Sequence, residues 1–296
     1  MSTLRNPFAD EGKFNDKLQA AFEQNLLAAL LEDVGSGDLT GKLVPEEPRA
    51  RARVIVREQA VLCGAPWFEG VMLAIDQDIE IDWQYAEGDL MAADSVVCTI
   101  EGAPRSILTA ERSALNFMQL LSGVASATRS YVDVVAGTRA RILDTRKTMP
   151  GLRQAQKYAV RVGGGDNQRM ALWDGILIKE NHIAAAGGIT PALRAAAALD
   201  AGVSIQVEVE TIAELEEALG AGAVSILLDN FDLDMMRDAV RINAGRALLE
   251  ASGGINMGTV RAIAETGVDR ISIGSLTKDV RATDYSLRIV SSSIVG

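Results

Sequence analysis

The sequence has very few histidines and cysteines, the residues that form imidazole or thiolate metal sites and disulfides. Its 296 residues include one histidine, His182, and two cysteines, Cys63 and Cys98. A single histidine excludes a metal site built from several imidazoles, and the two cysteines lack the close spacing of a zinc-binding motif. We therefore expect both cysteines to be reduced thiols in the core of a cytoplasmic protein.

Long apolar runs and an excess of positive charge are also missing. The longest clearly apolar run, residues 26–31, is far too short to cross a bilayer, and we expect no secretory signal at the start of the chain. The sequence has 29 Lys and Arg against 40 Asp and Glu, a formal net charge of −11. This charge disfavours binding to nucleic acid or to an anionic membrane, so we expect neither as a partner.

The first third of the chain predicts a small domain built on an antiparallel sheet. Apolar residues recur every four positions from Leu18 to Leu30 and predict a helix over 16–33. The next predicted elements follow in the order strand, strand, helix, strand, strand, at residues 51–57, 60–63, 66–75, 79–83 and 95–100. This order, with short links, is typical of an α+β domain.

The rest of the chain predicts alternating helices and strands. Thr109 can cap a helix that is interrupted at Ser122-Gly123, and a second helix follows over 125–135. The strands predicted beyond residue 139 are 141–144, 175–179, 205–209, 225–228, 247–251, 270–274 and 285–290. The helices predicted between them are 191–201, 213–221, 233–243 and 257–266.

Repeated β-α units of this spacing predict a parallel sheet, either closed as a barrel or open and doubly wound. Polar residues follow each predicted strand, which favours a barrel, because the carboxyl ends of barrel strands all meet at one rim. The predicted organisation is an α/β fold with one domain over 1–110, joined by 283–296, and a barrel over 111–282.

Residues 146–179 carry a local excess of positive charge in this acidic chain. Two acidic residues in this segment stand against seven basic ones, Arg146, Lys147, Arg153, Lys157, Arg161, Arg169 and Lys179. Such an excess suggests a pocket for a small anion. The alternative is a helix face in contact with solvent, which suits Lys157 and Arg161 but not Arg146 and Lys147, since these follow an apolar strand directly.

Two further groups of residues follow predicted strands. Glycine-containing loops over 252–255 and 273–276 let backbone N–H groups approach a phosphate, although glycines after strands are often only turns. Glu208 and Asp229 end two middle strands and are suited to hold Mg²⁺ or to accept ribose hydroxyls. The alternative for these carboxylates is helix N-capping by Asp229 and Glu210.

Lys179 also admits a different chemistry. A lysine with a depressed pKa can form a Schiff base, so an aldolase is the second candidate function. The glycines at 163–165 lack the G-x-G-x-x-G spacing and follow a predicted helix, which argues against a dinucleotide loop.

Long segments of the chain resemble the quinolinate phosphoribosyltransferase family (nicotinate-nucleotide pyrophosphorylase, carboxylating). These segments are 31–40 (LEDVGSGDLT), 111–116 (ERSALN), 121–125 (LSGVA), 144–153 (DTRKTMPGLR), 163–165 (GGG), 177–182 (LIKENH), 208–210 (EVE), 228–230 (LDN) and 252–254 (SGG). The resemblance implies an N-terminal α/β sandwich followed by an incomplete, seven-stranded β/α barrel. It also implies a homodimer or larger homo-oligomer, in which the first domain of one subunit covers the barrel mouth of another.

The resemblance implies roles for individual residues. The cations that would grip the two quinolinate carboxylates are Arg146, Lys147, Arg169 and Lys179, with Arg112 from a neighbouring subunit. The carboxylates that would serve the ribose and Mg²⁺ are Glu208 and Asp229. The implied 5′-phosphate cradle is Ser252, Gly253, Gly254, Gly274 and Ser275, and further implied lining residues are Thr145, Gln168 and Ile273. The implied catalytic residues are Lys147, Lys179, Glu208 and Asp229.

One position departs from the family pattern. The family usually reads Asn-His-Arg where this chain has Asn167-Gln168-Arg169. Glutamine keeps a neutral donor but cannot titrate or carry positive charge, which argues against an acid–base role at position 168.

The reaction that the resemblance implies needs no histidine base. The ring nitrogen of quinolinate displaces pyrophosphate from phosphoribosyl pyrophosphate, with Mg²⁺ and cationic side chains neutralising the leaving group. The carboxylate beside the quaternised nitrogen then leaves as CO₂, giving nicotinate mononucleotide in de novo NAD biosynthesis. Positioning and electrostatics suffice for both steps.

Overall fold

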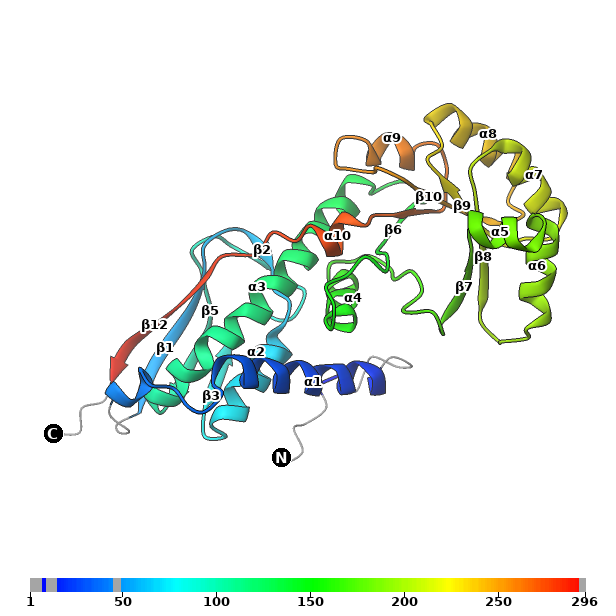
Figure 1. Ribbon diagram of the computed structural model, residues 1–296. Helices are drawn as coiled ribbons and strands as arrows, with labels where there is room; N and C mark the ends of the chain where they lie inside the picture. The colour runs from blue at the N-terminus through cyan, green and yellow to red at the C-terminus, as the bar shows by residue number, and fades with distance from the viewer. Residues whose placement is uncertain (1–6, 9–14, 45–48, 293–296) are drawn as a thin grey trace. The chain divides into compact units, whose positions relative to one another are not determined.

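The computed structural model describes residues 7–8, 15–44 and 49–292 (Figure 1). It divides into two compact units, the first made of residues 1–127, 149–163 and 279–296, the second of 128–148 and 164–278. These edges differ from the predicted boundaries at 110/111 and 282/283, because one helix continues through residue 110 and because residues 149–163 pack with the first unit.

The elements of the first unit are α1 (Asn15–Asp33), the 3₁₀ helix η2 (Gly41–Leu43), β1 (Ala50–Val56), β2 (Ala60–Val61), α2 (Ala65–Ile75), β3 (Glu80–Trp83), β4 (Leu90–Met91), β5 (Val96–Gly102), α4 (Arg153–Val162) and β12 (Tyr285–Ser292). Helix α3 (Pro104–Val134) begins in this unit and ends in the second. The prediction missed the 3₁₀ helix η2 and the two-residue strand β4, which are both too short to show a pattern.

The first unit is built on an antiparallel sheet in the order β12-β1-β5-β3. Strand β1 alternates buried aliphatic residues with more exposed ones, mostly arginines, which is the half-buried pattern predicted for 51–57. Strand β12 pairs with β1 from Val56↔Tyr285 to Ala50↔Ser292, so the predicted C-terminal strand does return to the first part of the chain. The sheet and its helices enclose a core centred on Trp67, which packs edge-on against Phe22 at a centroid distance of 5.6 Å.

The predicted interruption of the helix at Ser122-Gly123 is wrong, because α3 is one continuous helix of 31 residues. Both small residues serve close packing instead. A Cβ on Gly123 would overlap the carbonyl oxygen of Arg281, and the Ser122 hydroxyl donates to the carbonyl of Cys63 at 3.0 Å. Thr109 does not cap the helix either: its hydroxyl donates to the Asp38 carboxylate at 2.9 Å, five residues past the helix start.

Helix α4 corrects another expectation. Lys157 is fully buried, so the interpretation of this residue as a solvent-facing charge is wrong. Arg161 lies over the ring of Tyr158 at 5.7 Å from its centroid, where the guanidinium meets the negative face of the ring.

The elements of the second unit are β6 (Arg141–Leu143), β7 (Gly175–Ile178), α5 (Glu180–Ala186), α6 (Ile189–Ala198), β8 (Ser204–Val209), α7 (Ile212–Gly220), β9 (Ser225–Asp229), α8 (Leu233–Asn243), β10 (Leu248–Ser252), α9 (Val260–Ala264), β11 (Arg270–Ser272) and α10 (Ser275–Lys278). All six predicted strands are present. The short helices α5 and α10 were not predicted.

These strands form a parallel sheet in the order β6-β11-β10-β9-β8-β7, which confirms an incomplete β/α barrel. The sheet has six strands in the described residues, one fewer than the resemblance implies, and an isolated parallel bridge joins Leu143 of β6 to Asp166. Side chains alternate along each strand. In β8, Val207 and Val209 pack into the apolar core with the helices, whereas Gln206 and Glu208 take the opposite face.

No helix in the described ranges is long and apolar enough to cross a membrane. The two cysteines are free thiols, and both are buried in the first unit.

Candidate active site

The second unit contains a polar cavity of about 160 Å³ at the carboxyl ends of its strands. The predicted residues that line it are Thr145, Arg146, Lys147, Gln168, Arg169, Lys179, Glu208 and Ser252. The cavity also contacts residues that were not predicted, Leu177, Leu227, Glu250 and Ser272. One rim therefore gathers cations from three separate segments, as expected for a β/α barrel.

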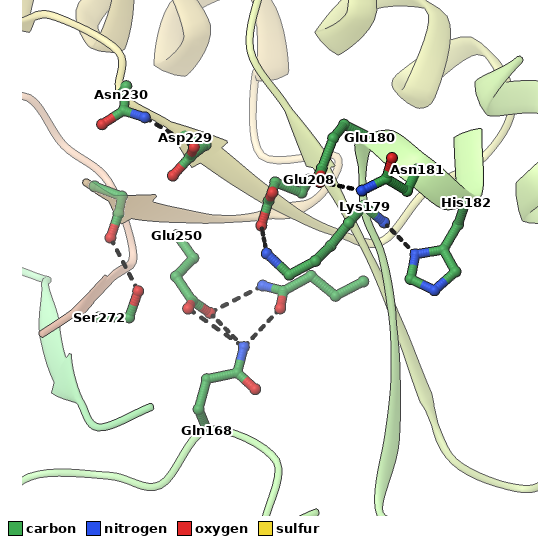
Figure 2. Close-up of polar contacts among 12 residues, drawn as sticks. Gln168, Lys179, Glu180, Asn181, His182, Glu208, Asp229, Asn230, Glu250 and Ser272 are labelled. Atoms are coloured by element: carbon green, nitrogen blue, oxygen red, sulfur yellow. Dashed lines mark hydrogen bonds and ion pairs between the residues drawn. The ribbon is translucent and has the colours of Figure 1, made fainter. Parts of the chain in front are cut away.

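The centre of the cavity is an ion pair between Lys179, just after β7, and Glu208 of β8. The Lys179 Nζ donates to Glu208 Oε2 at 2.6 Å (Figure 2). The Glu208 side chain is 8% exposed and that of Lys179 is 43% exposed. Burial raises the pKa of Glu208, and the neighbouring charges of Asp229 and Glu180 raise it further, while Lys179 opposes this shift.

Lys179 is held by its backbone as well. It occupies the N-cap position of α5, and its N–H donates to His182 Nδ1 at 3.1 Å. The only histidine of the chain therefore accepts a local hydrogen bond at a helix start.

Two arginines line the cavity: Arg146 lies just after β6, and Arg169 lies in the segment between α4 and β7. Burial lowers the pKa of the Arg169 guanidinium, and the nearby positive charge of Arg146 lowers it further. An arginine remains protonated despite such a shift. Two cations that destabilise each other inside a cavity gain free energy when an anion joins them, which favours a ligand with more than one negative group.

The segment that carries Gln168 and Arg169 is held by buried carboxylates. Asp144, at the end of β6, is fully buried and accepts from Asn167 Nδ2 at 2.6 Å and from the Gln168 N–H at 3.0 Å. Arg169 Nη1 donates to the carbonyl of Gly175 at 2.8 Å. The Asn167–Arg169 segment thus has a defined conformation even though only one β-bridge precedes it.

The Gln168 side chain contacts two buried residues of the barrel, Gln206 and Glu250, which we call the barrel floor. Its Nε2 donates to Gln206 Oε1 at 2.6 Å and lies 3.3 and 3.4 Å from the carboxylate oxygens of Glu250 (Figure 2). Gln206 Nε2 donates to Glu250 Oε2 at 2.9 Å. Glu250 is fully buried and Gln206 is 6% exposed.

Lys147 contacts residues of two segments, Thr145 just before it and residues 274–277 after β11. Its N–H donates to the hydroxyl of Thr145 at 3.0 Å, and its carbonyl accepts from the hydroxyl of the buried Thr277 at 2.7 Å. A Cβ on Gly274 would lie 3.2 Å from Lys147 Cδ. The absence of a side chain at position 274 therefore leaves room for the Lys147 side chain.

The two glycine loops, 252–255 and 273–276, differ in how much open space borders their backbone. Gly253 and Gly254 both have positive φ, of 107° and 58°, and a Cβ on Gly253 would overlap the side chain of Asn230. A Cβ on Gly254 would meet nothing within 4 Å, so its backbone borders open space. The N–H of Ile273 donates to the carbonyl of Leu143 at 2.9 Å and is committed to the sheet. Ser275 begins α10.

Asp229 and Glu210 are not helix caps, so the capping alternative is wrong. Thr211 caps α7 and Asp232 caps α8, each accepting from a backbone N–H in the first turn. Asp229 instead accepts from Asn230 Nδ2 at 2.9 Å. Its charge acts on the pKa of Glu208, which places the two carboxylates in one electrostatic environment.

The donor set suits a metal ion that arrives with a phosphate ligand. Within the described residues, no cluster of three His, Cys, Asp or Glu side chains could hold a metal ion by itself. Mg²⁺ commonly uses one or two carboxylates and takes its remaining ligands from substrate phosphates and water. Glu208 and Asp229 fit this requirement.

Arg112 lies apart from these residues in the sequence and belongs to the first unit. It is an exposed residue of α3 and borders a hollow that is also lined by Asp38 and Gly41.

Sequence reasoning missed the buried polar residues in and around the cavity, chiefly Gln206, Glu250 and Thr277. A signal was available for the first two. Gln206 precedes Glu208 by two positions, and Glu250 precedes Ser252 by two, so each shares a strand face with a predicted site residue.

The comparisons with known proteins agree with this geometry. The family model "Quinolinate phosphoribosyl transferase, C-terminal domain" matches residues 124–288, and the model of the N-terminal domain of the same family matches residues 38–122. The probable nicotinate-nucleotide pyrophosphorylase [carboxylating] of Bacillus subtilis is 39% identical over 264 residues, which are 89% of this chain and 91% of that protein.

Other relatives give the same result. The nicotinate-nucleotide pyrophosphorylase [carboxylating] of Mycobacterium leprae is 39% identical over 90% of this chain and 96% of its own length. The solved structure of the nicotinate-nucleotide pyrophosphorylase from Francisella tularensis superposes with a TM-score of 0.89 at 42% identity, covering 91% of this chain and 96% of that one. The chain therefore belongs to the quinolinate phosphoribosyltransferase family.

Proposed function

We propose that this protein is a decarboxylating quinolinate phosphoribosyltransferase, a pentosyltransferase of de novo NAD biosynthesis. It would convert quinolinate and phosphoribosyl pyrophosphate into nicotinate mononucleotide, pyrophosphate and CO₂. One observation carries the proposal. In this member of the family, a small cavity at the barrel mouth is lined by Arg146, Lys147, Arg169 and Lys179, and Lys179 forms an ion pair with the buried Glu208.

The cations would bind and orient the two adjacent carboxylates of quinolinate. Guanidinium groups pair with carboxylates through two parallel hydrogen bonds, and a lysine supplies a compact charge. Burial and the positive charge of Arg146 both lower the pKa of Arg169, so a dianion bound beside these two cations is favoured over an empty cavity. Binding in this way fixes the direction of the ring nitrogen, which must face the anomeric carbon.

The carboxylates would act on the sugar. As the bond from the anomeric carbon to pyrophosphate breaks and the bond to the ring nitrogen forms, the sugar develops positive charge. Glu208, ionised and ion-paired to Lys179, and Asp229 would stabilise that charge. The ring nitrogen ends as a positively charged pyridinium, and the electron pair left when the neighbouring carboxylate departs as CO₂ is stabilised by that charge before a proton replaces it.

Glu208 and Asp229 would also hold Mg²⁺ together with the pyrophosphate group of the substrate. The bound ion supplies positive charge that neutralises the leaving group. The open backbone at Gly254, with Ser252, Gly253, Gly274 and Ser275, would receive the 5′-phosphate.

A Schiff-base aldolase is not favoured by the same geometry. Such an enzyme needs a lysine amine that is available to attack a carbonyl carbon, whereas the Lys179 Nζ is engaged by the Glu208 carboxylate at 2.6 Å.

The assembly proposed for this chain is a homodimer or a larger homo-oligomer. Arg112 is exposed on α3, so it is free to serve as the residue that reaches a neighbouring subunit's cavity. We also propose a cytoplasmic location, since the two buried cysteines are free thiols, the state that a reducing compartment maintains.

The decisive experiment combines the protein with quinolinate, phosphoribosyl pyrophosphate and Mg²⁺ and follows CO₂ and nicotinate mononucleotide together. Product formation should require all three additions and should stop with a chelator. Nicotinate in place of quinolinate is the control for substrate choice, and preferential turnover of nicotinate would move the chain to a related phosphoribosyltransferase. No product at any protein concentration would exclude the proposed function.

The subunit arrangement has its own test. Arg112→Ala and Lys179→Ala should each be nearly inactive. Mixing equal amounts of the two under conditions that exchange subunits should restore about a quarter of the wild-type activity, because half of the dimers are mixed and each mixed dimer has one intact site. If the mixture stays inactive after exchange has been verified, Arg112 acts within its own subunit or not at all.

A further inference from the structure

Three buried or half-buried side chains, two of which line the cavity, form a chain of hydrogen bonds with only one direction. The Arg169 N–H donates to Gln168 Oε1 at 2.6 Å. The other end of that amide, Nε2, must then be the donor to Gln206 Oε1, and Gln206 Nε2 must be the donor to Glu250. A backbone N–H fixes the direction at one end and the carboxylate, which can only accept when ionised, fixes it at the other.

We propose that Glu250 is a positioning residue for the carboxylate-binding half of the site. Acting through Gln206, it holds Gln168 in one orientation and thereby fixes the backbone that presents Arg169 to the substrate. This inference rests on the proposed function, since it assigns Arg169 to a quinolinate carboxylate. Glu250 borders the cavity, but its carboxylate is fully buried and engaged with Gln168 and Gln206, so it would act on the substrate through these residues.

The fold explains why such a device is needed. The Asn167–Arg169 segment lies in the chain between β6 and β7, which are the two end strands of the sheet order. The only β-bridge near this segment in the described chain is at Asp166, the residue that precedes it, so the hydrogen bonds of a strand do not fix the position of residues 167–169. The side-chain hydrogen bonds from Asp144 on one side and from Glu250 and Gln206 on the other replace that ladder.

The network also gives position 168 a role other than direct contact. Gln168 Oε1 and Nε2 are both engaged with the protein, and Nε2 is directed to the barrel floor (Figure 2). A histidine at this position would add a proton that titrates near neutral pH, next to a buried carboxylate. With an amide here, the side chain at position 168 adds no titrating group to the network.

The direction of the hydrogen bonds makes the proposal testable by an exchange of two residues. Glu250→Gln keeps the shape but must present its own NH₂ to that of Gln168 or Gln206, leaving two donors facing each other. Gln206→Glu removes a donor and places a second buried carboxylate beside Glu250, which is unfavourable. The double variant Gln206→Glu/Glu250→Gln restores one carboxylate, and the amide now at position 250 can donate to it while accepting from Gln168.

The readout is calorimetric binding of two probes that need no turnover. Phthalate carries two adjacent carboxylates on a ring without a reactive nitrogen and reports the cation cluster. Phosphoribosyl pyrophosphate with Mg²⁺ reports the other half of the site. Glu250→Gln and Gln206→Glu should each weaken phthalate binding about 10- to 100-fold and leave the second probe within about threefold, and the double variant should recover most of the loss. Gln168→Leu, which cuts the link and leaves both floor residues intact, should show the same loss for phthalate alone.

Three results would overturn the proposal: equal weakening of both probes by the single variants, no recovery in the folded double variant, or unchanged phthalate binding by Gln168→Leu. If Glu250→Gln does not fold, the double variant and Gln168→Leu still decide between the outcomes. A wild-type protein that binds phthalate but does not consume quinolinate would refute the proposed function and leave this inference standing.

Discussion

Replacement of Lys179 by alanine is the most informative single change in the proposed site. It removes the ammonium that donates to Glu208 at 2.6 Å and takes one positive charge from the cavity. The Glu208 side chain, only 8% exposed, stays where it is and loses its cation. The change should therefore affect ligand binding more than folding, because Lys179 itself is 43% exposed.

The two magnitudes differ enough to be separated. A hydrogen bond between charged groups contributes about 1.5–3 kcal/mol, and each 1.36 kcal/mol is a factor of ten, so quinolinate binding should weaken about 10- to 150-fold. An ion pair with one partly exposed member contributes on the order of 1 kcal/mol to folding, which lowers the Tm by about 2–4 °C in a protein of this size.

The assays are calorimetric titration with quinolinate and a thermal melt of the same preparation. Arg237→Ala is the matched control, because Arg237 forms an ion pair with Asp234 at 2.6 Å on α8 and does not line the cavity. It should leave quinolinate affinity unchanged. Lys179→Arg should keep part of the transferase activity, which a Schiff-base mechanism does not allow.

Quinolinate affinity within about twofold of the wild type in Lys179→Ala would refute the role of this residue in binding. A loss of more than about 10 °C in Tm would show that Lys179 is chiefly structural.

Three other predictions concern protonation, the irregular position and the long helix. Because burial raises the pKa of Glu208, kcat/KM should fall on the acid side at a pH above the ordinary carboxyl value of 4.5. The folded state binds the Glu208 proton more tightly than the unfolded state does. The contribution of Glu208 to folding stability is therefore present at low pH and is lost as pH rises through the raised pKa. An acid limb at or below 4.5 in a pH–rate profile would contradict this. Gln168→His should keep activity within about tenfold, since an imidazole can still donate to Glu250, but it should add a pH dependence near neutrality that the wild type lacks; complete inactivity would show a pocket unlike that of the family. Gly123→Ala should lower the free energy of unfolding by about 1–3 kcal/mol although alanine favours helices, because its Cβ would overlap the carbonyl of Arg281. Gly220→Ala is the control, since a Cβ there meets nothing within 4 Å, and it should be neutral or stabilising. Chemical denaturation measures both changes.

The sequence by itself determined the elements and the family. Alternation in β1 and the repeated β-α units were visible because side-chain direction follows local backbone geometry, with period 2 in a strand and 3.6 in a helix. The polar residues after each barrel strand predicted a common rim, since parallel strands bring their carboxyl ends together. The cavity that contains Arg146, Lys179 and Glu208 agrees with that expectation.

Only the tertiary structure decided what depends on contacts between distant segments. Ser122-Gly123 looked like a helix break, but both residues are small so that Cys63 and Arg281 can approach α3 closely. Lys157 looked solvated and is buried.

The barrel floor, Gln206 and Glu250, likewise depends on contacts that the sequence does not show. Gln206 and Glu250 are 44 residues apart, and their hydrogen bond exists because β8 and β10 flank β9 in one sheet. Periodicity shows which face of a strand a residue takes, but the partner it meets there is set by strand order and by the packing of segments remote in sequence. The sequence therefore predicts an anion site at the basic segment 146–179, whereas the hydrogen bonds of Glu250 with Gln168 and Gln206 depend on the folded chain.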